Sequence, residues 1–242
     1  MRDYRLETRK RIAYIRKKLE EAHADGIVYG NSGGKDCTLV GILCKMACDN
    51  TVSVVMPCLS KRNFESDKED AEKVTAQFGI ENRVVDLSAI KSLVLETVSS
   101  ATTISDMASA NISPRLRMIT LYTIAQSENR LVAGTGNRSE AYMGYFTKWG
   151  DGAYDFDPIA DLTVTEIYEF LRFLEAPASI ITKAPSAGLF EGQTDEQEMG
   201  VTYKAIDDYL LTGVVSIQDK EIIDAFHKRS EHKRQMPSVY GE

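Results

Sequence analysis

The sequence predicts an α/β protein built on a doubly wound parallel sheet, with helices on both faces. Short apolar runs of strand length alternate along the chain with longer segments of helical periodicity. The first run, at residues 26–31, is continuously apolar, as expected for a buried strand of a parallel sheet. The first run is followed by a glycine-rich turn and then a helical segment, which is the order of a strand, a loop and a helix.

The expected strands are rich in Val, Ile, Leu and Ala and lie at residues 26–31, 51–56, 83–87 and 130–135. The expected helices show apolar residues at helical spacing and cover residues 5–22, 36–48, 63–78, 88–100, 114–128, 202–211 and 219–234. Another helix follows Thr163 and Glu166, which have the spacing of a capping box.

Three stretches lack a clear period. Residues 101–111 are small and polar, and we expect a loop or a frayed helix end there. Residues 136–158 are rich in glycine and aromatic residues, which favours a binding loop. Pro177 and Pro185 interrupt the chain, and a mobile loop is expected at residues 186–200.

Composition sets limits on function. The 242 residues are 43% hydrophobic and carry a formal net charge of −7. We expect one domain over residues 1–242 and no general nucleic-acid-binding surface. No apolar run approaches the roughly 20 residues that span a bilayer, and the charged N-terminus lacks a signal-peptide core. A cytoplasmic protein without a membrane partner is therefore expected.

The four cysteines form no C-x-x-C pair, and the three histidines are scattered. Free thiols in or near the core are expected for Cys37, Cys44, Cys48 and Cys58. A metal or redox site is the alternative for the first three, because they share one expected helix.

The first strand leads into a candidate phosphate-binding loop that consists of Gly30, Asn31, Ser32, Gly33, Gly34, Lys35, Asp36 and Cys37. Its glycines allow the backbone to approach a ligand closely, and the N–H groups at a helix start attract anions. Asp36 supplies a carboxylate that suits a divalent cation beside phosphates. The spacing matches neither a dinucleotide fingerprint nor a Walker loop. An ordinary strand-to-helix turn is the alternative.

A second polar segment, G-T-G-N-R-S-E, follows the fourth strand. Because ligands bind beyond the carboxyl ends of parallel strands, we expect it to line the same crevice as the first loop. Glu140 is then a candidate second ligand, with Asp36, for one Mg²⁺ ion. The alternative is a helix start that binds no metal.

The first loop resembles the S-G-G-x-D-S loop of the ATP pyrophosphatase (PP-loop) superfamily. Over nearly the whole chain, the sequence resembles NAD⁺ synthetases, in the order S-G-G-K-D-C, P-R-L-R-M, G-T-G-N-R-S-E, G-Y-F-T-K-W-G-D-G, P-S-A-G-L-F-E-G-Q-T-D-E-Q-E-M-G and E-H-K-R-Q-M-P. The resemblance implies the reaction deamido-NAD⁺ + ATP + NH₃ → NAD⁺ + AMP + diphosphate. The nicotinate carboxylate would attack the α phosphorus, and ammonia would then displace AMP.

The resemblance also implies roles for single residues. Gly30 to Cys37, Thr135 and Ser186 would contact ATP, and Asp36 and Glu140 would bind Mg²⁺. Asp151 would position or deprotonate the ammonia and, with Asp36, would be catalytic. Deamido-NAD⁺ would be bound by Arg115, Lys148, Asp155, His232 and Lys233. For the cationic and loop residues, plain solvated charges and helix-end cations are the alternatives. A homodimer and free ammonia as the donor, with no glutaminase or amidase domain, are also implied.

This sequence departs from the family pattern at three places. Cys37 replaces a serine, and a thiol is the weaker hydrogen-bond donor. Val164 stands where the family has an ATP-contacting lysine, a role that Lys183 is a candidate to fill. Ala153 and Tyr154 replace Gly-Ala before Asp155. Two other functions compete: a different PP-loop enzyme, such as a tRNA-modifying one, and a nucleotide-binding regulator that lacks catalysis.

Overall fold

The computed structural model describes residues 2–59, 64–182 and 195–241. Its centre is a parallel sheet in the order β3-β2-β1-β4, with β1 at Gly26–Gly30, β2 at Thr51–Val55, β3 at Glu81–Val84 and β4 at Arg130–Ala133. Both neighbours of β1 run parallel to it, with Val28 opposite Val52 on one side and Val132 on the other. The predicted doubly wound α/β fold is confirmed.

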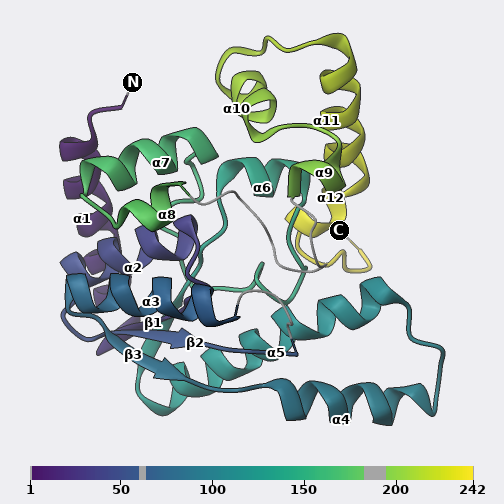
Figure 1. Cartoon of the computed structure of the whole chain (residues 1–242), viewed down its shortest axis with the longest axis horizontal. Helices are drawn as coiled ribbons and strands as arrows, with labels where there is room; N and C mark the ends of the chain where they lie inside the picture. The colour runs from purple at the N-terminus through teal and green to yellow at the C-terminus, as the bar shows by residue number, and fades with distance from the viewer. Residues whose placement is uncertain (1, 60–63, 183–194, 242) are drawn as a thin grey trace.

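The helices are α1 (Tyr4–Ala22), α2 (Lys35–Ala47), α3 (Phe64–Phe78), α4 (Ser88–Ser99), α5 (Asp106–Ser127), α6 (Arg138–Met143), α7 (Val164–Phe173), α8 (Ala178–Thr182), α9 (Asp195–Met199), α10 (Tyr203–Thr212), α11 (Ile217–Arg229) and α12 (Glu231–Arg234). In Figure 1, α4 and α5 reach outward below the sheet, while α10 and α11 stand above the rest of the molecule. The chain then returns through α12 to the end of α6.

The alternating side chains of β1 define two cores. Ile27 and Tyr29 face a core that is shared with α1, α2, α7 and α8, whereas Val28 faces a core that is shared with β2 and α5. Burial on both faces explains the continuous apolar run of β1, whereas β3 at the edge of the sheet is more exposed. A third cluster joins the ends of α6 and α7 to the C-terminal helices, and Val164 is one of its buried members.

Several predicted boundaries were wrong. Residues 106–111 are not a loop, because α5 begins at Asp106, where the Ser105 hydroxyl caps the amide of Ala108 at 3.3 Å. Pro114 lies buried within this helix rather than at its start, so tertiary packing outweighs the local cost of proline. The third strand is Glu81–Val84 instead of 83–87, because its register with β2 ends at Val55–Val84.

Two predicted loops also contain helices. The stretch 136–158 includes α6, which Asn137 starts through a complete capping box with Glu140. The end of the stretch 186–200 is α9, and its earlier part lies outside the described residues. The single helix expected at 219–234 is divided at Ser230, where the chain turns to pack against Gly144.

The four cysteines are free thiols, and all except the partly exposed Cys48 are buried, as predicted. Among the described residues, no helix combines the length and the apolar character that are needed to cross a membrane.

Candidate active site

The loops that follow β1 and β4 meet at the carboxyl edge of the sheet. The Asn137 side-chain amide donates to Asp36 Oδ1 at 3.1 Å, and the Glu140 carboxylate accepts from the Asn137 backbone N–H at 3.1 Å. Asn137 is fully buried, so it fixes the two carboxylates relative to each other. The two loops that were expected to line one crevice therefore lie side by side, with Asp36 on one and Glu140 on the other.

The first loop is shaped for an anion at the start of α2. Gly33 has a φ of +72°, which favours glycine, and its N–H donates to Asn31 Oδ1 at 3.0 Å. Gly34 caps α2 without any side-chain acceptor for the first-turn amides. These amides have no intrahelical partner, and together with the helix dipole they favour a phosphate at this point.

Two side chains of the loop are turned into the protein instead. Asn31 is buried and donates to Ser53 Oγ at 3.0 Å, which ties the loop to β2. The Cys37 thiol is also buried, with Asn31 Oδ1 at 3.3 Å and the Gly34 carbonyl at 3.2 Å. Burial raises the pKa of Cys37, so the thiol stays neutral near pH 7. Cys37 thus stabilises the loop through its contacts with Asn31 and Gly34 on the buried side.

Lys35, Asp36 and Glu140 form a charged cluster in a largely buried position. Lys35 Nζ lies 2.7 Å from Asp36 Oδ2 and 4.0 Å from Glu140 Oε1. Burial alone lowers the pKa of Lys35, but Asp36 and Glu140 outweigh it and raise that pKa above its ordinary value. Burial, followed by the charge of Asp36, raises the pKa of Glu140. The cluster therefore favours an additional positive charge.

The donor set suits Mg²⁺ only in combination with a substrate. The described part of the chain contains no group of three or more His, Cys, Asp or Glu side chains arranged to hold a metal. Mg²⁺ is commonly held by one or two carboxylates, with phosphate oxygens and water as the remaining ligands. Asp36 and Glu140 fit that pattern beside a phosphate at the start of α2.

Predicted binding residues from three segments come together at a second place. The Arg115 guanidinium donates to the Lys148 carbonyl at 3.4 Å, and Lys148 Nζ donates to the His232 carbonyl at 2.5 Å. Lys233 Nζ donates to the carbonyls of Gly144 and Phe146 at 2.7 and 2.8 Å. Arg115 and Lys148 remain exposed enough to meet a ligand, whereas Lys233 anchors the C-terminal segment to the chain after α6.

Asp151 lies in the turn after Lys148, and its Oδ1 accepts from the Thr147 backbone N–H at 3.0 Å. The residue is exposed. Desolvation raises the pKa of its carboxyl, and the Thr147 N–H and the Arg117 charge oppose that rise. Arg117 faces it from α5 and donates through Nε to the Met56 carbonyl at 3.2 Å. Desolvation lowers the pKa of Arg117. The positive charge of Arg117 stabilises the ionised Asp151 carboxylate and so opposes the rise in its pKa.

Asp155 and Asp157 support the edge of β4. The Asp155 carboxylate accepts from the Val132 N–H at 2.7 Å and from the Tyr122 hydroxyl at 3.2 Å. The Asp157 carboxylate accepts from the Gly136 N–H at 3.0 Å, which holds the segment that leads to Glu140. Burial raises the pKa of Asp157 to about 7. Asp155 is thus occupied with backbone support, and its role in binding stays a prediction.

The other positions that the sequence singled out lie apart from these contacts or outside the described residues. Thr135 is the second residue after β4, in the segment that leads to α6. Ser186 and Lys183 lie outside the described residues. Val164 is buried in the third cluster, so no cation stands at that position. Tyr154 packs its ring against Gly134, where an added Cβ would lie only 2.5 Å from the ring.

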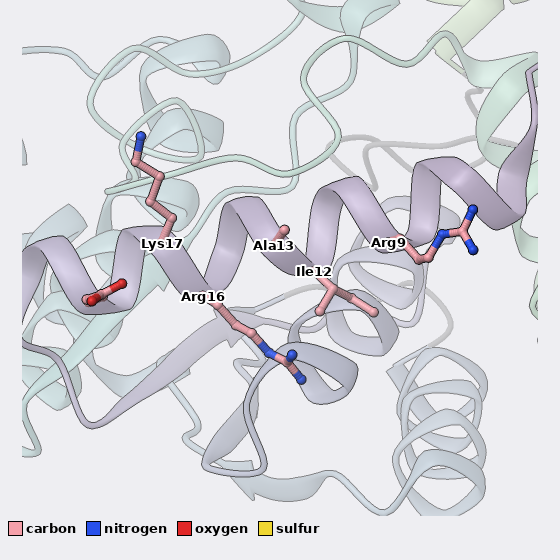
Figure 2. Close-up of a pocket in the computed structure, with 6 residues that line it drawn as sticks. Arg9, Ile12, Ala13, Arg16 and Lys17 are labelled. Carbon is pink, nitrogen blue, oxygen red and sulfur yellow. The ribbon is translucent and has the colours of Figure 1, made fainter.

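A groove with a volume of about 560 Å³ lies elsewhere, along α1 (Figure 2). It is lined by Arg9, Ile12, Ala13, Arg16, Lys17 and Glu20. Arg16 is already used there, because its Nε donates to the Ala47 carbonyl at the end of α2 at 3.0 Å. None of these residues belongs to the site at Asp36 and Glu140.

Sequence reasoning missed three supporting residues, namely Asn137, Asp157 and Arg117. The Asn137 cap carried a usable signal, because Asn followed three residues later by Glu is a capping-box spacing. Asp157 and Arg117 act through contacts with distant segments, which their local sequences do not reveal.

Comparisons with known proteins show the family of this chain. Residues 7–237 match the family model described as NAD synthase. The NH(3)-dependent NAD(+) synthetase of Carboxydothermus hydrogenoformans is 46% identical over 236 residues, which is 96% of each chain. An NMN synthetase from Francisella tularensis has a TM-score of 0.94 at 35% identity and full coverage of both chains. The NH3-dependent NAD synthetase from Campylobacter jejuni has a TM-score of 0.81 at 27% identity, with 99% of each chain covered.

Proposed function

The chain belongs to the NAD synthase family, and from this premise we propose that its reaction takes place at the sheet edge between Asp36 and Glu140. The protein is an ATP-dependent ligase that makes NAD⁺ from deamido-NAD⁺ and ammonia. One observation supports this location: Asn137 donates hydrogen bonds to both carboxylates, through its side-chain amide to Asp36 and through its backbone N–H to Glu140. Both lie next to the start of α2, whose first-turn amides have no side-chain acceptor.

The chemistry requires activation of a carboxylate, which is a poor electrophile. An oxygen of the nicotinate carboxylate attacks the α phosphorus of ATP, the bond to the β-phosphate oxygen breaks, and diphosphate leaves. The first-turn amides of α2, with Gly33 and Gly34 allowing close approach, stabilise the charge that develops on the phosphates. Ammonia then attacks the carbonyl carbon of the mixed anhydride, and AMP leaves with the oxygen that joined the two groups.

We propose that Asp36 and Glu140 hold Mg²⁺ against the ATP phosphates. When bound, the ion neutralises negative charge on the departing diphosphate. The close approach of two largely buried carboxylates supports this assignment, since both need a neighbouring positive charge.

Asp151 is the proposed partner of ammonia. Its Oδ1 is fixed by the Thr147 N–H and the residue is exposed, so the remaining oxygen lone pairs can accept from ammonium. A raised pKa makes this carboxylate a better proton acceptor than an ordinary aspartate. Arg115 and Lys148 supply nearby positive charge for the phosphates of deamido-NAD⁺, with His232, Lys233 and Asp155 as the other proposed binding residues.

We also propose a homodimer that forms through α4 and α5. No residue of α4 is buried, and its apolar side chains lie open: Leu93 is 62% exposed and Ile90 is 48% exposed. On α5, Ile119 is 55% exposed. An apolar face of this kind favours a second copy of the chain over water.

Light scattering after size-exclusion chromatography tests the dimer. Leu93→Glu should yield monomers, because it places a charge on that face. Ile217→Glu is the matched control, since Ile217 is 82% exposed on α11 and should leave the mass unchanged. A wild-type monomer, or a Leu93→Glu dimer of unchanged stability, would refute the proposed interface.

A second substrate is favoured by one observation. The NMN synthetase from Francisella tularensis aligns over the full length with a higher TM-score and identity than the NAD synthetase from Campylobacter jejuni. Amidation of nicotinate mononucleotide needs the same activation and the same attack by ammonia. It would differ only in the contacts beyond the first phosphate.

The test compares deamido-NAD⁺ with nicotinate mononucleotide, each with ATP, Mg²⁺ and ammonium chloride, and measures AMP and the amide product. We expect equal amounts of AMP and NAD⁺, dependence on ammonium rather than glutamine, and loss of turnover in Asp36→Asn. A higher kcat/KM for nicotinate mononucleotide would establish the second candidate. Nucleotide binding without turnover on either substrate would support a regulator instead.

A further inference from the structure

The Lys35 ammonium group occupies the space between the two carboxylates of the site. Its Nζ is 2.7 Å from Asp36 Oδ2 and 4.0 Å from Glu140 Oε1. It also lies over the Tyr203 ring, 5.6 Å from the ring centre. Only 7% of the lysine is exposed, so this position is built into the fold and is not a chance surface pairing.

We propose that Lys35 is an internal cation that holds the place of Mg²⁺ between Asp36 and Glu140 until ATP arrives. This inference rests on the proposed metal site. A metal ion bound by both carboxylates would lie close to the ammonium group, and two cations in a largely buried place repel each other strongly. Mg²⁺ must therefore displace Lys35 or share the carboxylates with it.

ATP offers Lys35 another partner. Lys35 is the first residue of α2, and phosphate is expected at that helix start. Once a phosphate is present, the ammonium group can leave the carboxylates without losing a negative neighbour. The free protein should consequently bind metal weakly, and the metal should enter together with the nucleotide. Without Lys35, the two carboxylates would bind the metal before ATP.

Binding of Mn²⁺ to the nucleotide-free full chain, followed by the electron paramagnetic resonance signal of the free ion, tests this proposal. Lys35→Met removes the charge and keeps most of the chain length. We expect its dissociation constant for Mn²⁺ to fall at least about tenfold below that of the wild type. Lys45→Met is the matched control, because Lys45 lies in the last turn of the same helix and pairs with the exposed Asp49.

A second substitution separates the possible failures. Adding Asp36→Asn to Lys35→Met should remove the gain in affinity if the ion uses this site. Measurable binding to the wild type that is unchanged or weaker in Lys35→Met would overturn the role of Lys35 and leave the metal site standing. Absence of binding in both proteins would also overturn the role of Lys35, because removal of its charge should let the two carboxylates bind the ion without ATP. The same titration with a non-hydrolysable ATP analogue then tests the metal site itself: binding that Asp36→Asn abolishes would leave that site standing, and absence of binding would overturn it. Circular dichroism checks folding, and Lys35→Gln, judged by the same criterion, replaces Lys35→Met if that variant is unfolded.

Discussion

Replacing Asp157 with asparagine should change how the stability of the fold depends on pH. Burial raises the pKa of Asp157 from its ordinary 3.8 to about 7 in the folded protein. The folded chain therefore holds this proton more tightly than the unfolded chain does. Stability contributed by the protonated carboxyl is fully present below about pH 4 and is lost as the pH rises toward 7.

The size of the effect follows from the same shift. About three pKa units at about 1.4 kcal/mol each give an upper bound of roughly 4 kcal/mol. This pKa already includes two backbone donors, the N–H groups of Gly136 and Ile159, which contact the carboxylate at 3.0 and 2.9 Å and oppose the effect of burial. A scan that starts at pH 4.5 covers only part of this bound, so we expect the wild type to lose about 2–3 kcal/mol relative to Asp157→Asn between pH 4.5 and pH 8.

Urea unfolding at several pH values measures this difference in the free energy of unfolding. The asparagine side chain does not titrate and can still accept one of the two backbone N–H groups. Asp49→Asn is the control, because the Asp49 side chain is fully exposed and should give a difference that hardly varies with pH. A difference between wild type and Asp157→Asn that stays constant, or that favours the wild type as pH rises, would refute the reasoning.

Two further substitutions test the packing of α2 and the bridge between Asp36 and Glu140. Gly41→Ala should destabilise the fold by about 1–3 kcal/mol in urea unfolding, because the new Cβ would lie 2.3 Å from the hydroxyl of the buried Tyr29; unchanged stability would contradict this packing. Asn137→Ala should cost about 1–3 kcal/mol through loss of the α6 cap, and it should lower kcat because Asp36 and Glu140 lose their common support. Full activity in a stable Asn137→Ala protein would show that the bridge is not needed.

The sheet and the first loop could be predicted from sequence because each depends on local signals. The apolar run of β1, Gly33 and Gly34, and the helical spacing of α2 all lie within one short segment. The position of Glu140 near Asp36 was also predictable, because parallel strands place their carboxyl ends at one edge.

Other features depended on contacts that local patterns do not carry. The start of α5 was missed because Pro114 is an unfavourable residue inside a helix, and only its burial in the fold compensates for it. The burial of Lys35 was not visible either, since a lysine in a polar loop is normally solvated. Its neighbours Glu140 and Tyr203 come from segments far along the chain.

Transfer of an oxygen label tests the central chemical claim most directly. Deamido-NAD⁺ labelled with ¹⁸O in both carboxylate oxygens would be converted with ATP, Mg²⁺ and ammonium chloride, and the products would be analysed by mass spectrometry. Attack on the α phosphorus predicts AMP that carries one labelled oxygen and an amide that keeps the other. Label in orthophosphate or diphosphate, with AMP unlabelled, would contradict activation at the α phosphorus and the placement of ATP on which this mechanism rests.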